Sequence, residues 1–467
     1  MLNDQCFNVL KKLTKKQWLS NLDNEQLLKL IQQKSEQLSK LVPQSEFKLK
    51  VLIAQKDEIE FIATFFACVI NHVDLFLCNP YWQQQEWQQV LSLVNPDLVF
   101  ADFHTKQIIS QVHIDSNKKN NINNFFEHSL IMIPTGGTSG KIKFTIHTWL
   151  SLTASVTGFC NYFNLEKVNS FCVLPLYHVS GLMQLIRSFL TQGNLFVLPY
   201  KVLKRELITS IDTANYFISL VPTQLQFLID LSSEWLAEFH TVLLGGAPAT
   251  PLLLERARKH NISLAPTYGM TETASQIATL KPQDFLKGNN NSGRVLPHAV
   301  IKILDQQGNI LNIEQTGLIN IKADSLFLGY YPQILEPNRV FATDDLGWFD
   351  EAGYLHIVGR DSHKIITGGE NVFPIEVERA ILNTKLVKDV CVIGIPDAYW
   401  GEAVTAIYVP LKNNLDFNLI EQKIRSQLSK YKQPKHWIAV EQIERSDRGK
   451  INYQKLATIA KNYLDNK

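Results

Sequence analysis

The sequence has few cysteines, no long apolar run and almost no net charge, and each shortage excludes a class of protein. The six cysteines of this 467-residue chain form no CxxC pair and no spacing that suits a zinc site or a disulfide framework. The most apolar stretch, residues 61–70, reaches about half of the ~20 residues that a bilayer crossing needs. With 46 basic and 44 acidic side chains, the formal charge of +2 gives no general attraction to nucleic acid or anionic lipid.

These shortages predict a protein of the reducing cytoplasm with no membrane span and no nucleic-acid partner. Residues 1–18 also lack the apolar segment and small-residue cleavage site of a secretory signal, so we expect no export. Any partner must then be recognised at a specific site. Whether the chain forms a homodimer is left open by the sequence.

The chain does have the composition of a large globular protein. Hydrophobic residues make up 45% and charged residues 19% of it, so it can bury a large core. In the first half, short β-branched or apolar runs alternate with longer runs of helical period, which predicts an α/β fold with β-α-β units and a largely parallel sheet. The predicted strands lie at residues 48–54, 74–78, 98–103, 129–134, 170–175, 194–199, 216–222 and 241–246.

The pattern changes in the second half of the chain. From about Gly317 the strands become shorter, and residues 347–360 predict a hairpin that turns at residues 350–353. A smaller α+β unit is expected from about Asp361 to the end of the chain. The sequence therefore predicts a large N-terminal domain, residues 1–360, and a small C-terminal domain, residues 361–467.

Residues 133–143, directly after a predicted strand, carry the clearest chemical signal. Their glycines let the backbone wrap closely round a ligand, and their hydroxyls and lysines suit a polyphosphate. The loop is not a Walker A motif, because no Gly stands five positions before Gly140 and Ile142 replaces the Ser or Thr after the Lys. A Gly/Ser-rich surface turn is the alternative. The residues concerned are Thr135, Gly136, Gly137, Thr138, Ser139, Gly140, Lys141 and Lys143.

This loop resembles the signature loop of the AMP-forming acyl-CoA synthetases, the adenylate-forming family that includes aryl-CoA ligases, luciferases and peptide-synthetase adenylation domains. Seven further segments resemble the family's motifs and occur in the family's order. They lie at residues 174–181, 244–248, 268–273, 343–345, 359–360, 368–371 and 448–450. The stretch up to about residue 125 carries no motif, so there the resemblance rests on the β-α-β pattern alone.

The resemblance implies the fold of adenylate-forming enzymes, with a large multi-sheet N-terminal domain and a mobile C-terminal α+β domain. It also implies ATP, Mg²⁺ and coenzyme A as cofactor and co-substrates. The residues that would bind the nucleotide and coenzyme are Thr135, Gly136, Gly137, Thr138, Ser139, Gly140, Lys143, Gly245, Gly246, Ala247, Tyr268, Asp345, Arg360, Gly368 and Gly369. Taken singly, many of these residues would be ordinary turn, core or surface positions.

Four residues are implied to take part in the chemistry. Glu272 is a hard oxygen ligand that suits a Mg²⁺ ion bridging ATP phosphates, and Thr271 beside it can hydrogen-bond to them. Lys450, after the flexible Gly449, is implied as the lysine that stabilises the transition state of adenylation. His178 is implied to line the acyl pocket. Each has a structural alternative: a helix N-terminal cap for the Thr-Glu pair, a solvated lysine, and a core histidine.

Three positions depart from the family's usual pattern. Ile142 replaces a Pro in the signature loop, and Asp344 replaces the Gly of a Thr-Gly-Asp motif. Ser362 stands at the hinge, two residues after the Arg, where Asp or Lys is usual. The resemblance still predicts a pivot there, because a hinge needs only backbone freedom.

The acid substrate is indicated by two details. The segment 268–276 resembles the corresponding segment of 2-succinylbenzoate:CoA ligases of menaquinone and phylloquinone synthesis, which have Ser-Gln after the motif. Arg187 falls on an apolar helix, where a charge needs a partner. One carboxylate of a dicarboxylate is activated and the other needs a cation or donors, for which Arg187, Ser275 and Gln276 are candidates. An ordinary intrahelical or surface ion pair of Arg187 is the alternative. The expected substrate-binding residues are His178, Arg187, Gly246, Ser275 and Gln276.

The predicted function is therefore ATP-dependent ligation of an acid to coenzyme A through an acyl-adenylate, with 2-succinylbenzoate as the expected acid. An aromatic or medium-chain acyl-CoA ligase is the alternative within the same class. An adenylation enzyme that loads a carrier protein, or an inactive nucleotide-binding protein, would be a different class.

Overall fold

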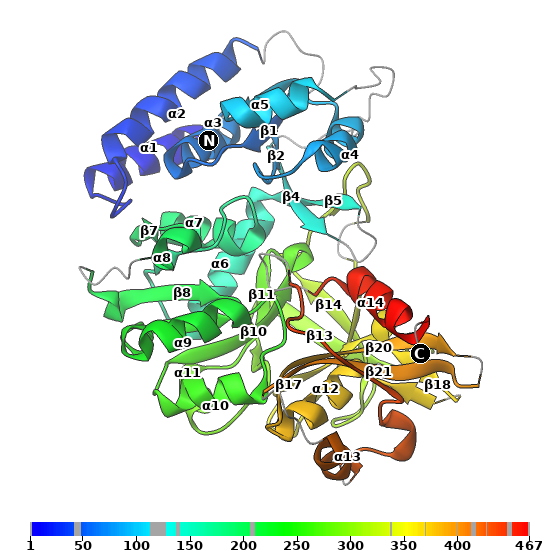
Figure 1. Ribbon diagram of the computed structural model, residues 1–467. Helices are drawn as coiled ribbons and strands as arrows, with labels where there is room; N and C mark the ends of the chain where they lie inside the picture. Colours follow the sequence, from blue (N-terminus) through cyan, green and yellow to red (C-terminus); the bar gives the residue numbers. More distant parts are fainter. Residues whose placement is uncertain are drawn as a thin grey trace.

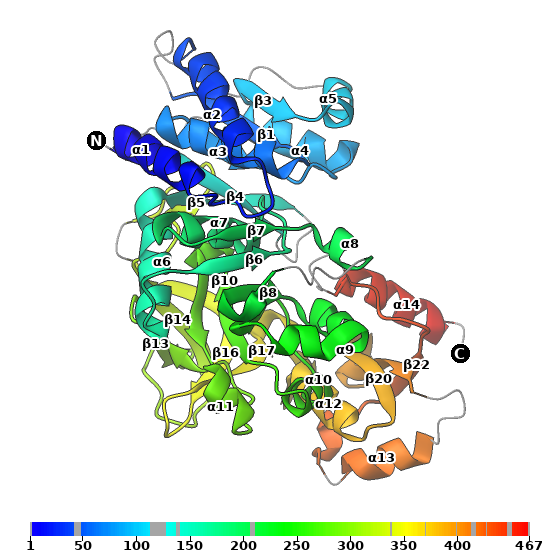
Figure 2. The same ribbon diagram turned by 90° about the vertical axis from the view of Figure 1, so that its left-hand side faces the viewer.

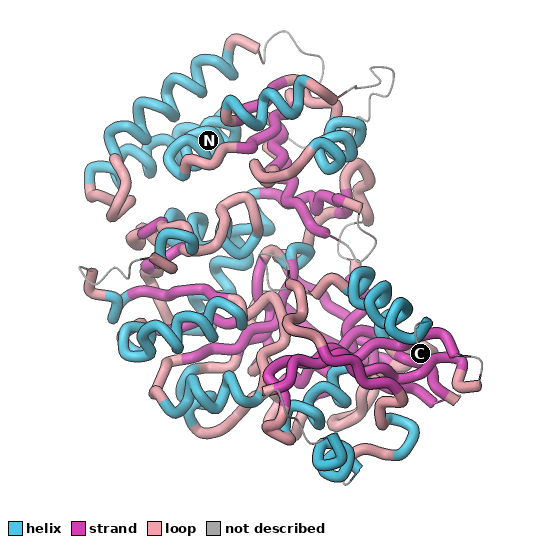
Figure 3. Tube along the Cα trace, viewed as in Figure 1, coloured by secondary structure: helices cyan, strands magenta, loops and turns pink. Residues whose placement is uncertain are grey.

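The protein is built from stacked sheets covered by helices, as Figure 1 shows for the whole chain. The computed structural model describes residues 2–41, 48–112, 128–136, 141–205, 211–336, 339–368, 370–397, 399–411, 417–425, 427–445 and 451–465. Figure 3 shows helices lying on the outside of the strands in the upper part of the molecule. Among the described residues, no helix combines the length and the apolar character that a membrane crossing requires.

The first sheet has the strand order β15-β5-β4-β2-β1-β3. Strands β1, β2, β3 and β4 pair in parallel, whereas β5 returns antiparallel to β4 as a hairpin. Its strands are β1 (Lys50–Ala54), β2 (Asp74–Leu77), β3 (Leu98–Ala101), β4 (Leu130–Gly136), β5 (Ile142–Thr148) and β15 (Gly329–Tyr330). The helices of this part are α1 (Leu2–Lys15), α2 (Asn24–Ser39), α3 (Glu58–Ile70), α4 (Gln84–Val94) and α5 (Phe103–Ser110).

The second sheet has the order β12-β11-β10-β9-β8-β6-β7, and its pairings are parallel except for β10 with β11 and β11 with β12, which are antiparallel. Its strands are β6 (Asn169–Cys172), β7 (Leu195–Val197), β8 (Tyr216–Leu220), β9 (Thr241–Leu244), β10 (Leu264–Met270), β11 (Ser275–Thr279) and β12 (Arg294–Val295). The helices of this part are α6 (Trp149–Phe163), α7 (Val179–Leu190), α8 (Tyr200–Leu203), α9 (Pro222–Ala237), α10 (Pro251–Lys259) and α11 (Pro282–Leu286), with the short 3₁₀ helices η2 (Thr213–Asn215) and η3 (Thr271–Thr273).

A third, antiparallel sheet has the order β13-β14-β16-β17. Its strands are β13 (Ala299–Leu304), β14 (Gly317–Ala323), β16 (Phe341–Phe349) and β17 (Leu355–Arg360). The predicted hairpin is confirmed: β16 and β17 are joined by a turn in which the Gly353 amide donates to the Asp350 carbonyl over 2.9 Å. The sheet ends at Arg360, the last residue of β17.

The C-terminal part has its own sheet, in the order β19-β18-β21-β20 with β22 beside β21. Its strands are β18 (Ile365–Thr367), β19 (Glu370–Val372), β20 (Val387–Asp397), β21 (Gly401–Pro410) and β22 (His436–Ala439). Its helices are α12 (Pro374–Asn383), α13 (Phe417–Arg425) and α14 (Tyr453–Asp465), with η4 (Asp361–His363) and η5 (Lys430–Lys432). In Figure 2 this lobe lies at the lower right, beside α9 and α10.

The eight strands predicted in the first half are all confirmed as β1, β2, β3, β4, β6, β7, β8 and β9. The α/β class and the largely parallel pairing are confirmed with them. The apolar stretch 61–70 lies in α3, whose residues from Phe61 to Val69 are all buried. That helix is apolar because it packs between the first sheet and α2, and not because it meets lipid.

Candidate active site

The predicted phosphate loop connects the β4–β5 hairpin at the edge of the first sheet. Thr135 pairs with Lys143, and Gly136 pairs with Ile142, at the base of the loop. The loop residues Gly137, Thr138, Ser139 and Gly140 lie outside the described residues. The departure at Ile142 has a structural use, because its backbone N–H donates to Gln89 Oε1 over 3.2 Å. A Pro there would have no N–H to donate.

Lys143 and Glu272 meet through a tyrosine. The Lys143 Nζ atom lies 5.2 Å from the centre of the Tyr330 ring. The Tyr330 hydroxyl donates to Glu272 Oε1 over 2.7 Å. Burial, and then the Glu272 carboxylate, raise the pKa of Tyr330, so its hydroxyl stays a donor. Lys143, Glu272 and Tyr330 are distant in the sequence and lie close together in the structure. A site that binds phosphates beside a metal ion needs the lysine and the carboxylate to be close in this way.

A buried histidine fixes the backbone before Glu272. His147 in β5 is fully buried, and its Nε2 lies 2.8 Å from the Thr271 carbonyl, so this nitrogen carries the proton and donates. Its Nδ1 lies 3.1 Å from Ser151 Oγ. Burial lowers the pKa of His147 to about 4, although the bond to Thr271 acts in the opposite direction. His147 is therefore neutral at pH 7 and ties β5 to the Thr271-Glu272 turn.

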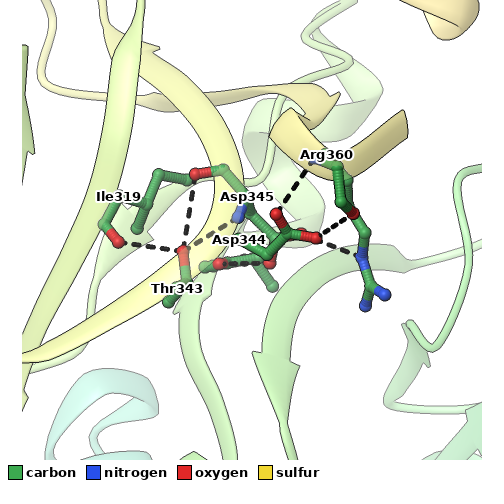
Figure 4. A network of polar contacts seen from close by, with 7 residues as sticks. Ile319, Thr343, Asp344, Asp345 and Arg360 are labelled. Atoms are coloured by element: carbon green, nitrogen blue, oxygen red, sulfur yellow. Dashed lines mark hydrogen bonds and ion pairs between the residues drawn. The ribbon is translucent and has the colours of Figure 1, made fainter. Parts of the chain in front are cut away.

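Tyr268, Asp345 and Arg360 form one network, part of which is drawn in Figure 4. The Tyr268 hydroxyl donates to Asp345 Oδ2 over 2.7 Å, and Arg360 Nε donates to Asp345 Oδ1 over 3.3 Å. The Thr343 hydroxyl accepts a hydrogen bond from the Asp345 backbone N–H and donates one to the Ile319 carbonyl. These two bonds fix this strand segment. The aromatic ring, carboxylate and guanidinium predicted for the purine and ribose therefore lie side by side.

The two departures at the hinge contact each other. The Asp344 carboxylate accepts from the Ser362 backbone N–H over 3.0 Å and also from the Ser362 hydroxyl. A Gly at position 344 would have no side chain to do this. The carboxylates of Asp344 and Asp345 thus hold two residues of the segment where the third sheet ends, Ser362 and Arg360.

Gly245, Gly246 and Ala247 follow β9 directly. The Gly245 amide donates to the Leu220 carbonyl over 3.1 Å, so the turn lies at the carboxyl ends of β8 and β9. Gly246 has φ +82°, a left-handed conformation that favours glycine. Ligands of open α/β sheets gather at this edge. The turn therefore stands where the predicted base or substrate would lie.

Arg187, Ser275 and Gln276, which were predicted to bind a second carboxylate, are in direct contact. Arg187 in α7 is 3% exposed, and one of its terminal nitrogens donates to Ser275 Oγ over 2.7 Å and to Gln276 Oε1 over 2.8 Å. Its guanidinium carbon lies 4.3 Å from the centre of the Phe159 ring. Burial lowers the pKa of Arg187 to about 10, so it remains charged at pH 7. Among the described residues Arg187 forms no ion pair with a carboxylate. The alternative of an ordinary intrahelical or surface ion pair is therefore not observed there.

His178 precedes α7 and is buried, 7% exposed, with its ring against Tyr177. Gly368 lies in the C-terminal lobe with φ +58°, and Gly369 lies outside the described residues. Lys450 also lies outside the described residues. Its neighbours in sequence are anchored, because Arg445 pairs with Ile451 and donates to Asp389 in β20 over 2.9 Å.

The segment after Lys450 reaches the hinge. The Tyr453 ring at the start of α14 lies 4.4 Å, centre to centre, from the ring of His363 in η4. Burial lowers the pKa of His363 first, and the nearby Arg360 lowers it further. The lysine-bearing end of the chain therefore packs on the residues that follow Arg360.

The donor set suits a magnesium ion held mainly by its nucleotide. Within the described ranges, no three His, Cys, Asp or Glu residues gather as a metal site. Glu272 offers one carboxylate, one oxygen of which accepts from Tyr330. Mg²⁺ in phosphate-transfer sites is bound through one or two carboxylates together with substrate phosphates and waters. A single carboxylate beside a phosphate loop fits that pattern, whereas it would not fit zinc.

Sequence reasoning missed Tyr330 and His147, although both contact predicted residues. Tyr330 stands in a Gly-Tyr-Tyr-Pro segment whose first two residues form β15, and no motif marks it. His147 lies in a strand whose central residues are buried on both faces, so the alternation of polar and apolar residues that would show its direction is absent.

Comparison with known proteins yields consistent matches. The family model described as "AMP-binding enzyme" matches residues 46–331, and that of its C-terminal domain matches residues 376–450. A 2-succinylbenzoate–CoA ligase from Listeria monocytogenes is 35% identical over 69% of this chain and 68% of its own. Another from Listeria innocua is 29% identical over 86% of this chain and 87% of its own.

Solved structures share the fold. An o-succinylbenzoate CoA synthetase from Bacillus subtilis, in complex with its acyl-adenylate intermediate, has a TM-score of 0.78 at 23% identity and covers 96% of this chain and 97% of its own. An ATP-bound MatB from Rhodopseudomonas palustris has a TM-score of 0.80 at 23% identity, covering 93% of each chain.

Proposed function

Because the chain belongs to the AMP-binding enzyme family, we propose that it activates 2-succinylbenzoate with ATP and transfers the acyl group to coenzyme A, as in menaquinone or phylloquinone synthesis. The enzyme is an AMP-forming acid–thiol ligase that uses ATP, Mg²⁺ and coenzyme A. In the first half-reaction a carboxylate oxygen attacks the α-phosphorus of ATP and expels pyrophosphate. In the second, the coenzyme A thiol attacks the acyl carbon and AMP leaves.

The nucleotide is bound by segments from three sheets. The loop at Thr135–Lys143 surrounds the phosphates, with Lys143 supplying positive charge and Glu272 holding the magnesium ion. That ion, when bound, neutralises phosphate charge. Asp345 and Arg360 bind the ribose hydroxyls, and Tyr268 faces the purine. The support for this assignment is the chain of contacts from Lys143 through Tyr330 to Glu272 and from Tyr268 to Asp345.

Lys450 stabilises the transition state of adenylation, and the C-terminal domain that carries it begins after Arg360. In support, the third sheet ends at Arg360, and every strand of the C-terminal sheet starts at Ile365 or later. Rotation about Ser362 would bring Gly368 and Gly369 to the thioester step. The bonds from Ser362 to Asp344 favour the orientation in which they form, and breaking them is part of the rotation.

The substrate assignment rests on one observation, the buried Arg187 whose polar contacts among the described residues are to neutral side chains. A buried charge without a carboxylate partner is costly, so an incoming carboxylate would be bound strongly. Ser275 and Gln276 complete the site, and His178 and Gly246 line the pocket nearer the reacting carboxyl group. A fatty acid would have no group to place beside the guanidinium.

The experiment is a panel of acids incubated with the purified protein, MgATP and coenzyme A, with products measured by mass. We expect 2-succinylbenzoate to give its coenzyme A thioester and AMP, at a kcat/KM well above that of benzoate, succinate and octanoate. The thioester step also distinguishes a coenzyme A ligase from an adenylation enzyme that loads a carrier protein. Transfer of the acyl group to free coenzyme A would contradict a carrier-loading enzyme. Indifference to 2-succinylbenzoate would contradict the proposed substrate, and absence of pyrophosphate exchange with any acid would contradict the reaction.

Two further assignments remain predictions. A cytoplasmic location is consistent with six free cysteines, five of them buried. Homodimerisation would be measured by analytical ultracentrifugation of the full chain.

A further inference from the structure

His298 is a partly buried histidine to which none of the motifs assigns a role. It lies between β12 and β13, and its carbonyl accepts from the Asp324 amide over 3.2 Å. Within the described part of the chain, both of its ring nitrogens are buried and lack a hydrogen-bond partner. Buried polar groups are almost always paired, so a ring with two unpaired nitrogens needs an explanation.

The chain makes room for this ring at Gly158 in the middle of α6. A Cβ atom added to Gly158 would lie 1.8 Å from His298 Nδ1 and 2.5 Å from its Cγ, so only glycine accommodates the imidazole there. The ring is therefore held against the helix by close packing, and not by hydrogen bonds. A packed ring with unused nitrogens suggests that a ligand completes its contacts.

The same part of α6 carries the contact to Arg187. Phe159, next to Gly158, lies under the guanidinium at 4.3 Å. α6, α7 and β11 pack against one another, as Figure 1 shows near the centre of the molecule. Two more buried nitrogens here have no partner among the described residues, Arg187 Nε and Gln276 Nε2. Three side chains from separate elements thus offer unused hydrogen-bond donors in one region.

Burial and two nearby charged residues set the protonation state of His298. Burial is the main cause that lowers its pKa to about 4, Arg187 lowers it further, and Asp324 acts in the opposite direction. The imidazole is therefore neutral at pH 7 and has one N–H to donate. A carboxylate that enters would accept this N–H and would pair with the charged guanidinium of Arg187.

We propose that His298 determines specificity at the far end of the acid pocket, donating a hydrogen bond to the second carboxylate of a dicarboxylic acid beside Arg187. This inference rests on the proposed function, since it concerns the same substrate. His298 does not take part in the chemical steps, because the reacting carboxyl group lies at the other end of the acid.

The alternative is that His298 only fills space against Gly158. The two roles differ in what a substitution does to related acids. A space-filling residue would affect all acids alike through stability or kcat. A specificity-determining residue affects KM for acids with a second carboxylate and leaves acids without one unchanged.

The test compares His298→Gln, which keeps a donor, with His298→Leu, which does not. Steady-state kinetics are measured with 2-succinylbenzoate and with a monocarboxylate of the same ring and chain. We expect His298→Leu to raise KM for the dicarboxylate about 10- to 100-fold, since a hydrogen bond to a charged group is lost, and to leave kcat and the monocarboxylate unchanged. His298→Gln should restore most of the difference. His240→Leu replaces an exposed histidine just before β9; it is the control and should behave as wild type.

The outcomes separate the two proposals. If wild type ligates 2-succinylbenzoate and His298→Leu keeps the wild-type ratio of KM values, this inference is wrong and the proposed function stands. If wild type does not prefer the dicarboxylate, both are wrong. If His298→Leu does not fold, Gly158→Ala displaces the ring from its site, and the same ratio of KM values is measured: a lost preference for the dicarboxylate supports the inference and an unchanged preference overturns it.

Discussion

Lys450→Ala is expected to lower the rate of acyl-adenylate formation by about 100- to 1,000-fold. Attack of a carboxylate on the α-phosphate brings two negative groups together, and the ammonium stabilises the pentacovalent state. Removal of one donor that acts in the transition state typically costs about 2.7–4 kcal/mol. Rapid-quench measurement of pyrophosphate release in a single turnover gives this rate directly.

The same variant should still form the thioester from a supplied acyl-adenylate. The thiol attack involves no new charge on phosphorus, and in the proposed rotation the C-terminal domain would by then have carried Lys450 away. Lys455→Ala is the matched control, because Lys455 lies five residues later and is paired at the surface with Glu444 over 2.6 Å. An equal loss in both half-reactions of Lys450→Ala would contradict this division of labour.

Arg187→Leu is expected to lower kcat/KM for 2-succinylbenzoate by about 30- to 5,000-fold, because removing one partner of a buried charge pair costs about 2–5 kcal/mol. Ser275 and Gln276 would also lose the donor that they share. Ligation of a monocarboxylate of similar shape should be spared, since no second carboxylate needs the guanidinium. The ratio of the two kcat/KM values is the quantity to measure.

Two variants control for packing. Arg187→Lys keeps a charge but cannot reach both Ser275 and Gln276 with one planar group, so an intermediate loss is expected. Arg258→Leu removes an arginine that also lies over an aromatic ring, Phe285 at 4.5 Å, on the remote helix α10. It should keep the wild-type ratio. A parallel loss for both acids in Arg187→Leu would show that the guanidinium has only a structural role.

The sequence predicts the parts of this molecule that depend on local pattern. The strands of the first two sheets are short apolar runs that end in Gly or Pro, and their order follows from the β-α-β alternation. The Asp350–Gly353 turn follows from turn chemistry alone. Arg187, Ser275 and Gln276 were predicted to share a site because their chemistry fits one ligand, and they are in contact.

Contacts between distant segments could not be predicted in this way. The bond from Asp344 to Ser362 joins two departures that each weakened the resemblance when taken alone. Tyr330 reaches Glu272 only because β15 pairs with β5 at the edge of the first sheet. His298 is noticeable only when the missing Cβ of Gly158 and the unpaired ring nitrogens are seen together. Such pairings depend on the tertiary fold, which single positions do not reveal.

The most direct test of an acyl-adenylate route uses 2-succinylbenzoate whose carboxyl oxygens are oxygen-18. If the carboxylate attacks the α-phosphorus and coenzyme A then breaks the bond between acyl carbon and oxygen, the released AMP carries one labelled oxygen, as mass spectrometry would show. Unlabelled AMP, or label appearing in inorganic phosphate alongside ADP, would contradict the account.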